Sequence, residues 1–291
     1  MFAGSLVALV TPFKNGKLDE EGLRRNVRFQ IEEGSDGLVA IATTGESPTL
    51  SEEEKERVTR ICLEESNHRV PVIVSTGTNS TLKTVEATKK AEEEGVDGAL
   101  VITPYYNRPT QEGLVRHFEA VAPSVKIPII VYNVPGRTGV NLHPKTAARL
   151  AEFQNITAIK EASGNLDQVS AIIAECGTKL AVLSGDDSLT LPMLALGAKG
   201  VISVVANILP LDVAEMVRAF GRGDVESAQR MHFRLFPIIR TLFRETNPIP
   251  VKRAMELIGM AAGEPRLPLV KLSEDGEAEL RVVLTDRGVL D

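Results

Sequence analysis

The chain repeats one local pattern three times, and this repeat limits its fold more than any other feature. In each copy a helix-like segment ends at a glycine, two residues follow, and a second glycine opens an apolar run. The copies are EEGSDGLVAI at 32–41, EEGVDGALVI at 93–102 and ALGAKGVISV at 195–204. The first glycine suits the left-handed backbone just past a helix C-terminus, and the second allows a tight turn into a strand. The repeat therefore predicts a recurring connection from helix to strand.

Five further apolar runs have the character of the same strands. They are SLVALV near residue 5, PVIVST from 71, PIIVYN from 128, ITAIK from 156 and KLAVLSG from 179. The runs are continuous rather than alternating, which is typical of parallel strands buried on both faces. Helical signals fill the gaps, such as the capping box that begins at Ser51 and the stripe of Leu23, Val27 and Ile31.

Eight strand–helix units of this kind predict a (β/α)8 TIM barrel. A doubly wound open sheet is the alternative, but no G-x-G-x-x-G motif follows the first strand. After residue 223 the strand signal stops, and several prolines mark breaks between helices. We therefore expect a catalytic barrel over 1–223 and a C-terminal helical region over 224–291.

Charge and cysteine content narrow the class of protein. Lys and Arg number 33 and Asp and Glu number 39, and the net charge of −6 argues against nucleic acid or an anionic membrane as partner. Cys62 and Cys176 lie in helix-like segments and form no disulfide framework, so a cytoplasmic setting is expected. The N-terminal apolar run ends at Thr11 and Pro12, too early to span a bilayer.

The four histidines lie far apart in the sequence, which disfavours a zinc site, and we expect no cofactor.

Chemistry in such a barrel belongs where the strands end, because the loops that follow them form the active face. All three tyrosines of the chain, Tyr105, Tyr106 and Tyr132, lie at expected strand ends. A single tyrosine at a strand end often has no functional role, because its apolar ring packs against the protein while its hydroxyl reaches water. Three together favour a functional role.

Lys160 is the most informative single residue, because it ends an apolar run at the top of the barrel. Burial of an ammonium lowers its pKa, and a neutral amine can attack a carbonyl to form a Schiff base. The alternative is a structural ion pair with Glu161 or with another carboxylate at the rim of the barrel, or an amine that reaches solvent on its long stem. Position alone leaves both open.

The neighbouring strand ends favour the Schiff base. Thr43 and Thr44 offer hydroxyl and backbone donors for a carboxylate, although a plain turn of small residues has the same composition. Tyr132 ends the strand next to that of Lys160 and can move protons. Arg137 follows on the next loop and suits a carboxylate, although an isolated loop arginine is more often solvated.

These residues stand in motifs that resemble a known family, the pyruvate-dependent class I aldolases. The likeness covers nearly the whole chain and is greatest to the dihydrodipicolinate synthase branch. The matching motifs are LVTPF at 9–13, ATTGES at 42–47, PYYN at 104–107, YNVPGRTG at 132–139 and IKEASG at 159–164. Ala42 replaces the glycine that opens the family's GTTGES motif, and we expect alanine to fit an ordinary β conformation there.

The resemblance implies a role for each matching residue. Lys160 would form the imine with pyruvate. Tyr132, Thr43 and Tyr106 would form a proton relay, with Tyr106 supplied by a neighbouring subunit. Thr44 and adjacent amides would bind the pyruvate carboxylate.

The second substrate and the assembly follow from the same resemblance. Arg137 would bind the carboxylate of L-aspartate 4-semialdehyde, and Gly185 and Ile202 match backbone positions that line the site. The sialic-acid branch of the family lacks this arginine. The resemblance also implies a homotetramer made of two dimers.

The resemblance further points to a regulatory site for L-lysine, but with two changes. Ser47, Asn79 and Tyr105 match that site, whereas Lys55 replaces a histidine and Lys83 replaces a glutamate of lysine-sensitive members. Two added cations should repel the ammonium of lysine. We therefore expect lysine inhibition to be weak or absent.

The sequence thus favours a lyase of lysine (diaminopimelate) biosynthesis that condenses pyruvate with L-aspartate 4-semialdehyde. The same imine chemistry on a sugar-acid aldehyde is the first alternative. A non-catalytic ligand-binding barrel is the second, and the full set of motifs disfavours it.

Overall fold

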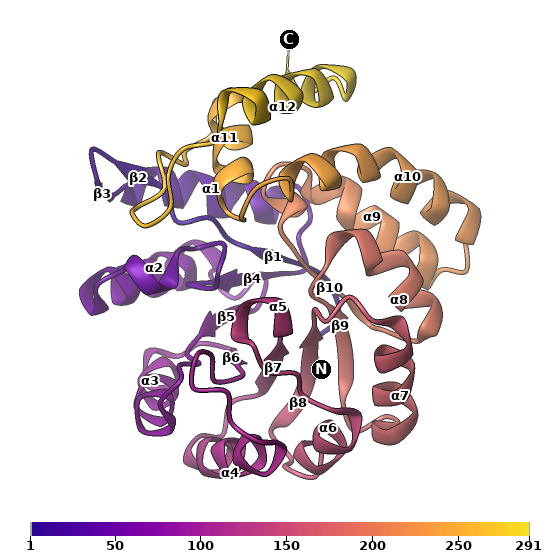
Figure 1. The fold of residues 1–291 in the computed structure, drawn as a ribbon. Helices are drawn as coiled ribbons and strands as arrows, with labels where there is room; N and C mark the ends of the chain where they lie inside the picture. The colour runs from indigo at the N-terminus through magenta and orange to yellow at the C-terminus, as the bar shows by residue number, and fades with distance from the viewer. Residues whose placement is uncertain (1, 291) are drawn as a thin grey trace. The chain divides into compact units, whose positions relative to one another are not determined.

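The computed structural model describes residues 2–290 and contains a closed barrel of eight strands, as the repeat predicts (Figure 1). Around the barrel the strands follow the order β1, β10, β9, β8, β7, β6, β5, β4. Their bounds are β1 Gly4–Ala8, β4 Gly37–Ala40, β5 Val72–Ser75, β6 Gly98–Ile102, β7 Ile129–Asn133, β8 Ile156–Glu161, β9 Ala181–Ser184 and β10 Gly200–Ser203. All eight coincide with the apolar runs, so the expected (β/α)8 class is confirmed.

Helices follow the strands in sequence. They are α1 Glu20–Glu32, α2 Glu52–Ser66, α3 Thr81–Glu94, α4 Gln111–Val121, α5 Pro135–Thr138, α6 Pro144–Leu150, α7 Leu166–Cys176, α8 Thr190–Leu196, α9 Pro210–Gly221, α10 Val225–Leu242, α11 Ile249–Leu257 and α12 Glu274–Asp286. Short 3-10 turns are η1 Ser47–Thr49, η2 Ala122–Ser124, η3 Asp187–Leu189 and η4 Val205–Asn207. Within residues 2–290 no helix is long and apolar enough to cross a membrane.

A small antiparallel hairpin of β2 (Phe13–Lys14) and β3 (Lys17–Leu18) was not predicted from the sequence. Strands of two residues carry no apolar run, so the pattern that predicts the barrel strands could not find them.

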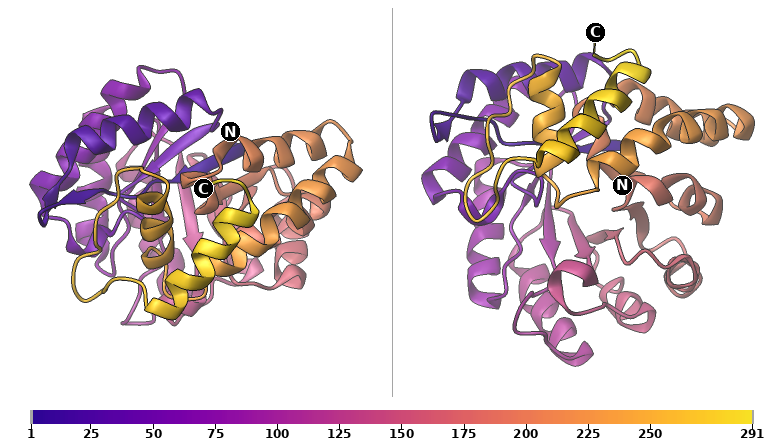
Figure 2. Two further views of the ribbon diagram at one scale, coloured as in Figure 1. Left: turned by 90° about the horizontal axis from the view of Figure 1, so that it is seen from above. Right: turned by 45° about the horizontal axis from the view of Figure 1, so that its top comes forward.

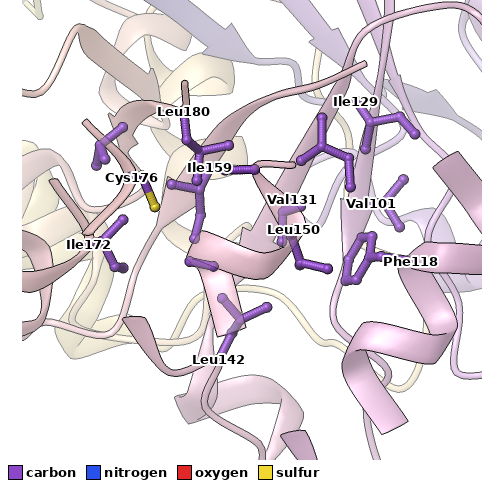
Figure 3. Packing of buried hydrophobic residues seen from close by; sticks show 14 of the residues in the cluster. Val101, Phe118, Ile129, Val131, Leu142, Leu150, Ile159, Ile172, Cys176 and Leu180 are labelled. Atoms are coloured by element: carbon purple, nitrogen blue, oxygen red, sulfur yellow. The ribbon is translucent and has the colours of Figure 1, made fainter. Parts of the chain in front are cut away.

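By contacts, the chain forms two compact units, which are described one at a time. The first comprises the residues up to Gly4 together with Pro71–Ile202. Helices α3, α4, α6 and α7 lie outside strands β6, β7 and β8 (Figure 1). The core between these layers includes Phe118 of α4, Val131 of β7, Leu150 of α6 and Ile159 of β8, each at most 1% exposed (Figure 3).

The second unit comprises Ser5–Val70 and the chain from Ser203 onward. Strand β1 pairs in parallel with β4, with Leu6 opposite Gly37. The region after residue 223 contains α10, α11 and α12, and α12 packs against both of the others (Figure 2). Within the described chain no strand follows β10.

The two glycines of the second repeat, Gly95 and Gly98, serve different purposes. Gly95 lies at φ +88° and caps α3 in the left-handed conformation, as expected, and Gly34 and Gly197 also have positive φ. Gly98 instead begins β6, where a Cβ atom would lie only 2.6 Å from the ring of Phe2. Close approach of a neighbouring side chain, rather than a tight turn, therefore requires this second glycine.

A buried ion pair joins two distant segments of the second unit. Lys252 Nζ of α11 donates to Glu46 Oε1 at 2.6 Å, and each side chain is 1% exposed. The backbone N–H of Arg266 donates to the other carboxylate oxygen at 2.8 Å. The ring of Phe13 lies 4.2 Å from the Lys252 amine. Desolvation lowers the pKa of Lys252, and the negative charge of Glu46 opposes that effect.

Breaking this pair should be far more costly than breaking an exposed one. Lys252→Met leaves the Glu46 carboxylate buried without its cation, so we expect the free energy of unfolding to fall by about 3–5 kcal/mol. Lys55, paired with Glu52 at 2.7 Å in a partly exposed position, provides the control. Lys55→Met should cost no more than about 1 kcal/mol. Urea denaturation followed by circular dichroism measures the free energy of unfolding of both variants. Equal losses in the two variants would contradict the view that the buried Lys252–Glu46 pair matters more than the exposed one.

Candidate active site

Lys160 lies at the end of β8 in the first unit, with its side chain among buried groups. The residue is 5% exposed, and its amine lies 4.3 Å from the centre of the Tyr132 ring. Tyr132 of β7 stands directly opposite Lys160 in the parallel register. Burial lowers the pKa of Lys160 to about 8; the negative charge of Asp187 opposes this shift and the positive charge of Arg137 adds to it. An appreciable fraction of the amine is therefore neutral near neutral pH.

Gly185, which follows β9, leaves the space that the lysine side chain fills. A Cβ atom at this position would lie 3.1 Å from both Cγ and Cε of Lys160 and 2.7 Å from Cβ of Ala162. The Gly185 N–H donates to the Glu161 carbonyl at 2.8 Å. Glycine is thus required here by close approach, since any larger residue would displace Lys160.

A polar layer lies on the other side of the same two strands, because successive side chains of a strand alternate. Asn133 pairs with Glu161 in the register, and its Nδ2 donates to Glu161 Oε2 and to Asn141 Oδ1, each at 2.9 Å. The Ser163 N–H donates to Glu161 Oε1 at 2.7 Å, and Leu142 N–H donates to Asn133 Oδ1. Glu161 therefore accepts hydrogen bonds from amide groups on the side of the strands away from Lys160.

Four further expected residues lie in the first unit. Arg137 is exposed within the short helix α5, rather than in an open loop. Tyr105 is 37% exposed and Tyr106 is 89% exposed, with a positive φ of 71° at Tyr106. Ile202 is buried within β10. Nearly the whole Tyr106 side chain is therefore accessible on the surface of its own chain.

Thr43 and Thr44 lie in a tight turn that follows β4 in the second unit. The N–H of Gly45 and that of Ser47 both donate to the Ala42 carbonyl, and Thr11 Oγ1 donates to the Gly45 carbonyl at 2.7 Å. Thr43 is half-buried and Thr44 is 2% exposed.

The strain in this turn lies on either side of the threonines. Ala42 is not among the residues with positive φ, as expected, but Ile41 (φ 58°) and Glu46 (φ 55°) are. A positive φ is costly for a β-branched residue and persists only where the surroundings enforce it. The turn is therefore held by its contacts rather than by its own preference.

Two residues of the C-terminal region supply those contacts. Asn247 Nδ2 donates to Thr44 Oγ1 at 3.0 Å, and Lys252 holds Glu46 through the buried ion pair. The Lys252 amine also donates to the Thr11 carbonyl at 3.3 Å. Sequence reasoning missed Asn247, Lys252 and the Asn133–Glu161 layer, because none ends a strand on the inner face. The sequence offered one signal for the polar layer: Glu161 directly follows Lys160 at the end of an apolar run.

The expected regulatory positions are divided between the two units. Asn79, Lys83 and Tyr105 belong to the first; the Asn79 carbonyl accepts from Asn107 Nδ2 at 2.8 Å, and Lys83 is exposed. Ser47 and Lys55 belong to the second, and both are half-buried. Across residues 2–290 no group of three His, Cys, Asp or Glu side chains could hold a metal ion.

Comparisons with known proteins place this geometry in a family. The model of the dihydrodipicolinate synthetase family matches residues 1–287. The chain belongs to this family. It is 56% identical to a 4-hydroxy-tetrahydrodipicolinate synthase of Citrifermentans bemidjiense, over 98% of this chain and 99% of the relative. A similar protein of Geobacter sulfurreducens is 55% identical, with the same coverage.

Solved structures agree with the fold of this family member. The crystal structure of a dihydrodipicolinate synthase from Thermotoga maritima matches with a TM-score of 0.98 at 46% identity, over all of both chains. Another dihydrodipicolinate synthase matches with a TM-score of 0.97 at 52% identity, over 99% of this chain and 100% of the other.

The electrostatic surroundings of Lys160 predict a pH profile for its reaction with carbonyl compounds. Borohydride trapping of an imine should rise with pH until the amine is neutral, and level off above pH about 8, because only the neutral amine attacks. Arg137→Ala removes a positive charge that lowers the pKa of Lys160, so its profile should move to higher pH. Arg116→Ala, on the exposed face of α4, is the control and should leave the profile in place. If the pH profile of imine trapping is the same in Arg137→Ala as in the unaltered protein, the charge of Arg137 does not lower the pKa of Lys160.

Proposed function

We propose that Lys160 is the amine through which this chain condenses pyruvate with L-aspartate 4-semialdehyde. The chain is a pyruvate-dependent lyase of lysine biosynthesis, with the activity for which its 4-hydroxy-tetrahydrodipicolinate synthase relatives are named. The observation that carries the residue assignment is the buried Lys160 amine, with its pKa lowered to about 8 beside Tyr132.

The reaction begins with the neutral amine of Lys160. Its nitrogen adds to C2 of pyruvate, and loss of the carbonyl oxygen as water leaves an imine. Loss of a proton from the methyl carbon then gives an enamine, whose carbon forms a bond to the aldehyde carbon of the semialdehyde. The amino group of the semialdehyde finally adds to C2 and displaces Lys160, which closes the ring and regenerates the free amine.

Each of these steps moves a proton, and we assign these transfers to Tyr132. Its ring contacts the Lys160 amine in a buried setting, where a phenol can donate and accept in turn. We assign Thr43 and Tyr106 to the same relay on the strength of the family motifs. The 89% exposure of Tyr106 supports its use by a neighbouring subunit.

Two carboxylates need binding groups, one for each substrate. Thr44 and the backbone amides before Gly45 suit the pyruvate carboxylate, since they offer donors without a full charge. Arg137 suits the carboxylate of the semialdehyde, because a guanidinium binds a carboxylate with two parallel hydrogen bonds. Gly185 and Ile202 would line the site, and Gly185 already contacts the Lys160 side chain.

We further propose a homotetramer of two dimers located in the cytoplasm. The exposure of Tyr106 supports self-association, and the two free, buried cysteines suit a reducing compartment. Sedimentation analysis tests the assembly, and a monomer at micromolar concentration would refute it.

Trapping experiments test the assignment of Lys160. The protein incubated with pyruvate and then borohydride should carry a stable adduct on Lys160, located by peptide mass spectrometry. Lys160→Ala should give no adduct and lose at least about 10³-fold in kcat, because no other amine forms the imine. Lys179→Ala, which removes an exposed lysine amine paired with Glu152, is the control and should keep both the adduct and the activity. An adduct elsewhere, or an active Lys160→Ala variant, would overturn the assignment.

Arg137→Ala should separate the two substrates. We expect kcat/KM for the semialdehyde to fall by about 10²-fold, since a charge-assisted bidentate contact is lost. Imine formation with pyruvate at a pH above 8 should change by less than about threefold. Equal losses in both measurements would show that Arg137 has a purely structural role.

L-lysine should inhibit this enzyme weakly or not at all. Lys55 and Lys83 place positive charge at the positions that match the regulatory site, and both repel an ammonium. Steady-state assays with millimolar L-lysine should show little change in rate. The double variant Lys55→His with Lys83→Glu should gain sensitivity, and tight inhibition of the unaltered protein would contradict the proposal.

A further inference from the structure

We infer that Asn247 is a positioning residue that orients the Thr44 hydroxyl as a hydrogen-bond donor and thereby selects a carboxylate at that end of the site. The inference rests on the proposed function and adds a residue from the C-terminal region to it. Asn247 lies outside every motif that carries the family resemblance, and it stands just before α11.

The contact itself is short and buried. Asn247 Nδ2 lies 3.0 Å from Thr44 Oγ1, and the two residues are 6% and 2% exposed. They are separated by 203 positions in sequence. A side-chain hydrogen bond between buried groups is directional, so it fixes both rotamers.

The direction of this bond decides what Thr44 can do. A hydroxyl has one proton and two acceptor sites. When the amide N–H of Asn247 occupies an acceptor site, the hydroxyl proton is directed toward a different acceptor. Thr44 is thereby prepared to donate, and a carboxylate oxygen is the acceptor that a donor of this kind binds best.

The residues at both ends of the Asn247–Thr44 hydrogen bond are also held by other contacts. On the threonine side, Glu46 is fixed by Lys252 at 2.6 Å and by the backbone N–H of Arg266 at 2.8 Å. On the asparagine side, Lys252 belongs to α11, the helix that Asn247 precedes. The ion pair therefore fixes the turn and the helix together, so the hydroxyl is oriented before substrate arrives.

Steady-state kinetics of Asn247 variants test the inference. Asn247→Ala frees the Thr44 hydroxyl to rotate, and we expect the KM for pyruvate to rise about tenfold while kcat changes less than about threefold. Asn247→Asp should raise this KM further, since the new carboxylate accepts the Thr44 proton and repels pyruvate. The KM for the semialdehyde should change less than about threefold in both.

Asn26 provides the matched control. It is also buried, and its Nδ2 donates to the Ala261 carbonyl at 2.7 Å, so it too ties the N-terminal part of its unit to the C-terminal region. Asn26→Ala should lower the melting temperature but leave the KM for pyruvate within about twofold. A similar rise in KM for Asn26→Ala and Asn247→Ala would mean that only stability is involved, and would overturn the inference.

A double-mutant cycle tests whether Asn247 acts through Thr44. Thr44→Val alone should raise the KM for pyruvate, and adding Asn247→Ala should then have no further effect. Independent, multiplying effects would overturn the inference, as would a Thr44→Val variant with an unchanged KM. If Asn247→Ala does not fold, Asn247→Ser is measured in the same way, and the Thr44→Val result still decides.

The outcome is separable from that of the proposed function. If the unaltered protein forms no pyruvate adduct on Lys160, the proposed function fails. If it forms the adduct and Asn247→Ala keeps the unaltered KM for pyruvate, only the role of Asn247 fails.

Discussion

The burial of one amine, that of Lys160, is the physical constraint to which its surroundings in the barrel are fitted. A parallel strand covered on both faces has no place for a charged side chain except near its end, where loops can adapt to it. Lys160 occupies that position in β8, beside the Tyr132 ring and over the glycine that leaves room for its stem. Desolvation lowers its pKa to about 8, so the fold itself keeps part of this amine neutral near neutral pH. The amide layer around Glu161 allows this, because it satisfies the neighbouring carboxylate without using the lysine.

The strands and their order along the chain could be predicted from the sequence because they depend on local patterns. Continuous apolar runs identified all eight strands, and Ser51 and Glu54 form the predicted capping box. The same reading located Lys160 and Tyr132, since a strand end is a local property. Asn247 and Lys252 could not be predicted in this way. Their importance comes from partners some two hundred positions away, and no local pattern records such a contact.

The C-terminal helices thereby acquire a purpose that their own sequence does not reveal. They contribute no strand, yet the amide of Asn247 and the ammonium group of Lys252 in α11 hold the threonine turn. A turn with Ile41 and Glu46 at positive φ needs such support, because its own residues prefer other conformations. The conformational cost of the positive φ angles in the turn is thus offset by the hydrogen bond from Asn247 and the ion pair with Lys252.

The buried pair also has a consequence for how the protein is made. Glu46 and Lys252 are 206 positions apart, so the ribosome exposes the carboxylate long before the amine exists. Translation adds roughly 5–20 residues per second, which leaves Glu46 waiting for its partner for about ten seconds or more. Throughout that interval the carboxylate must remain hydrated, and the turn that carries Thr43 and Thr44 cannot close over it. A chain that has been synthesised only as far as residue 246 would therefore contain Lys160 but lack both groups that hold the threonine turn, Asn247 and Lys252.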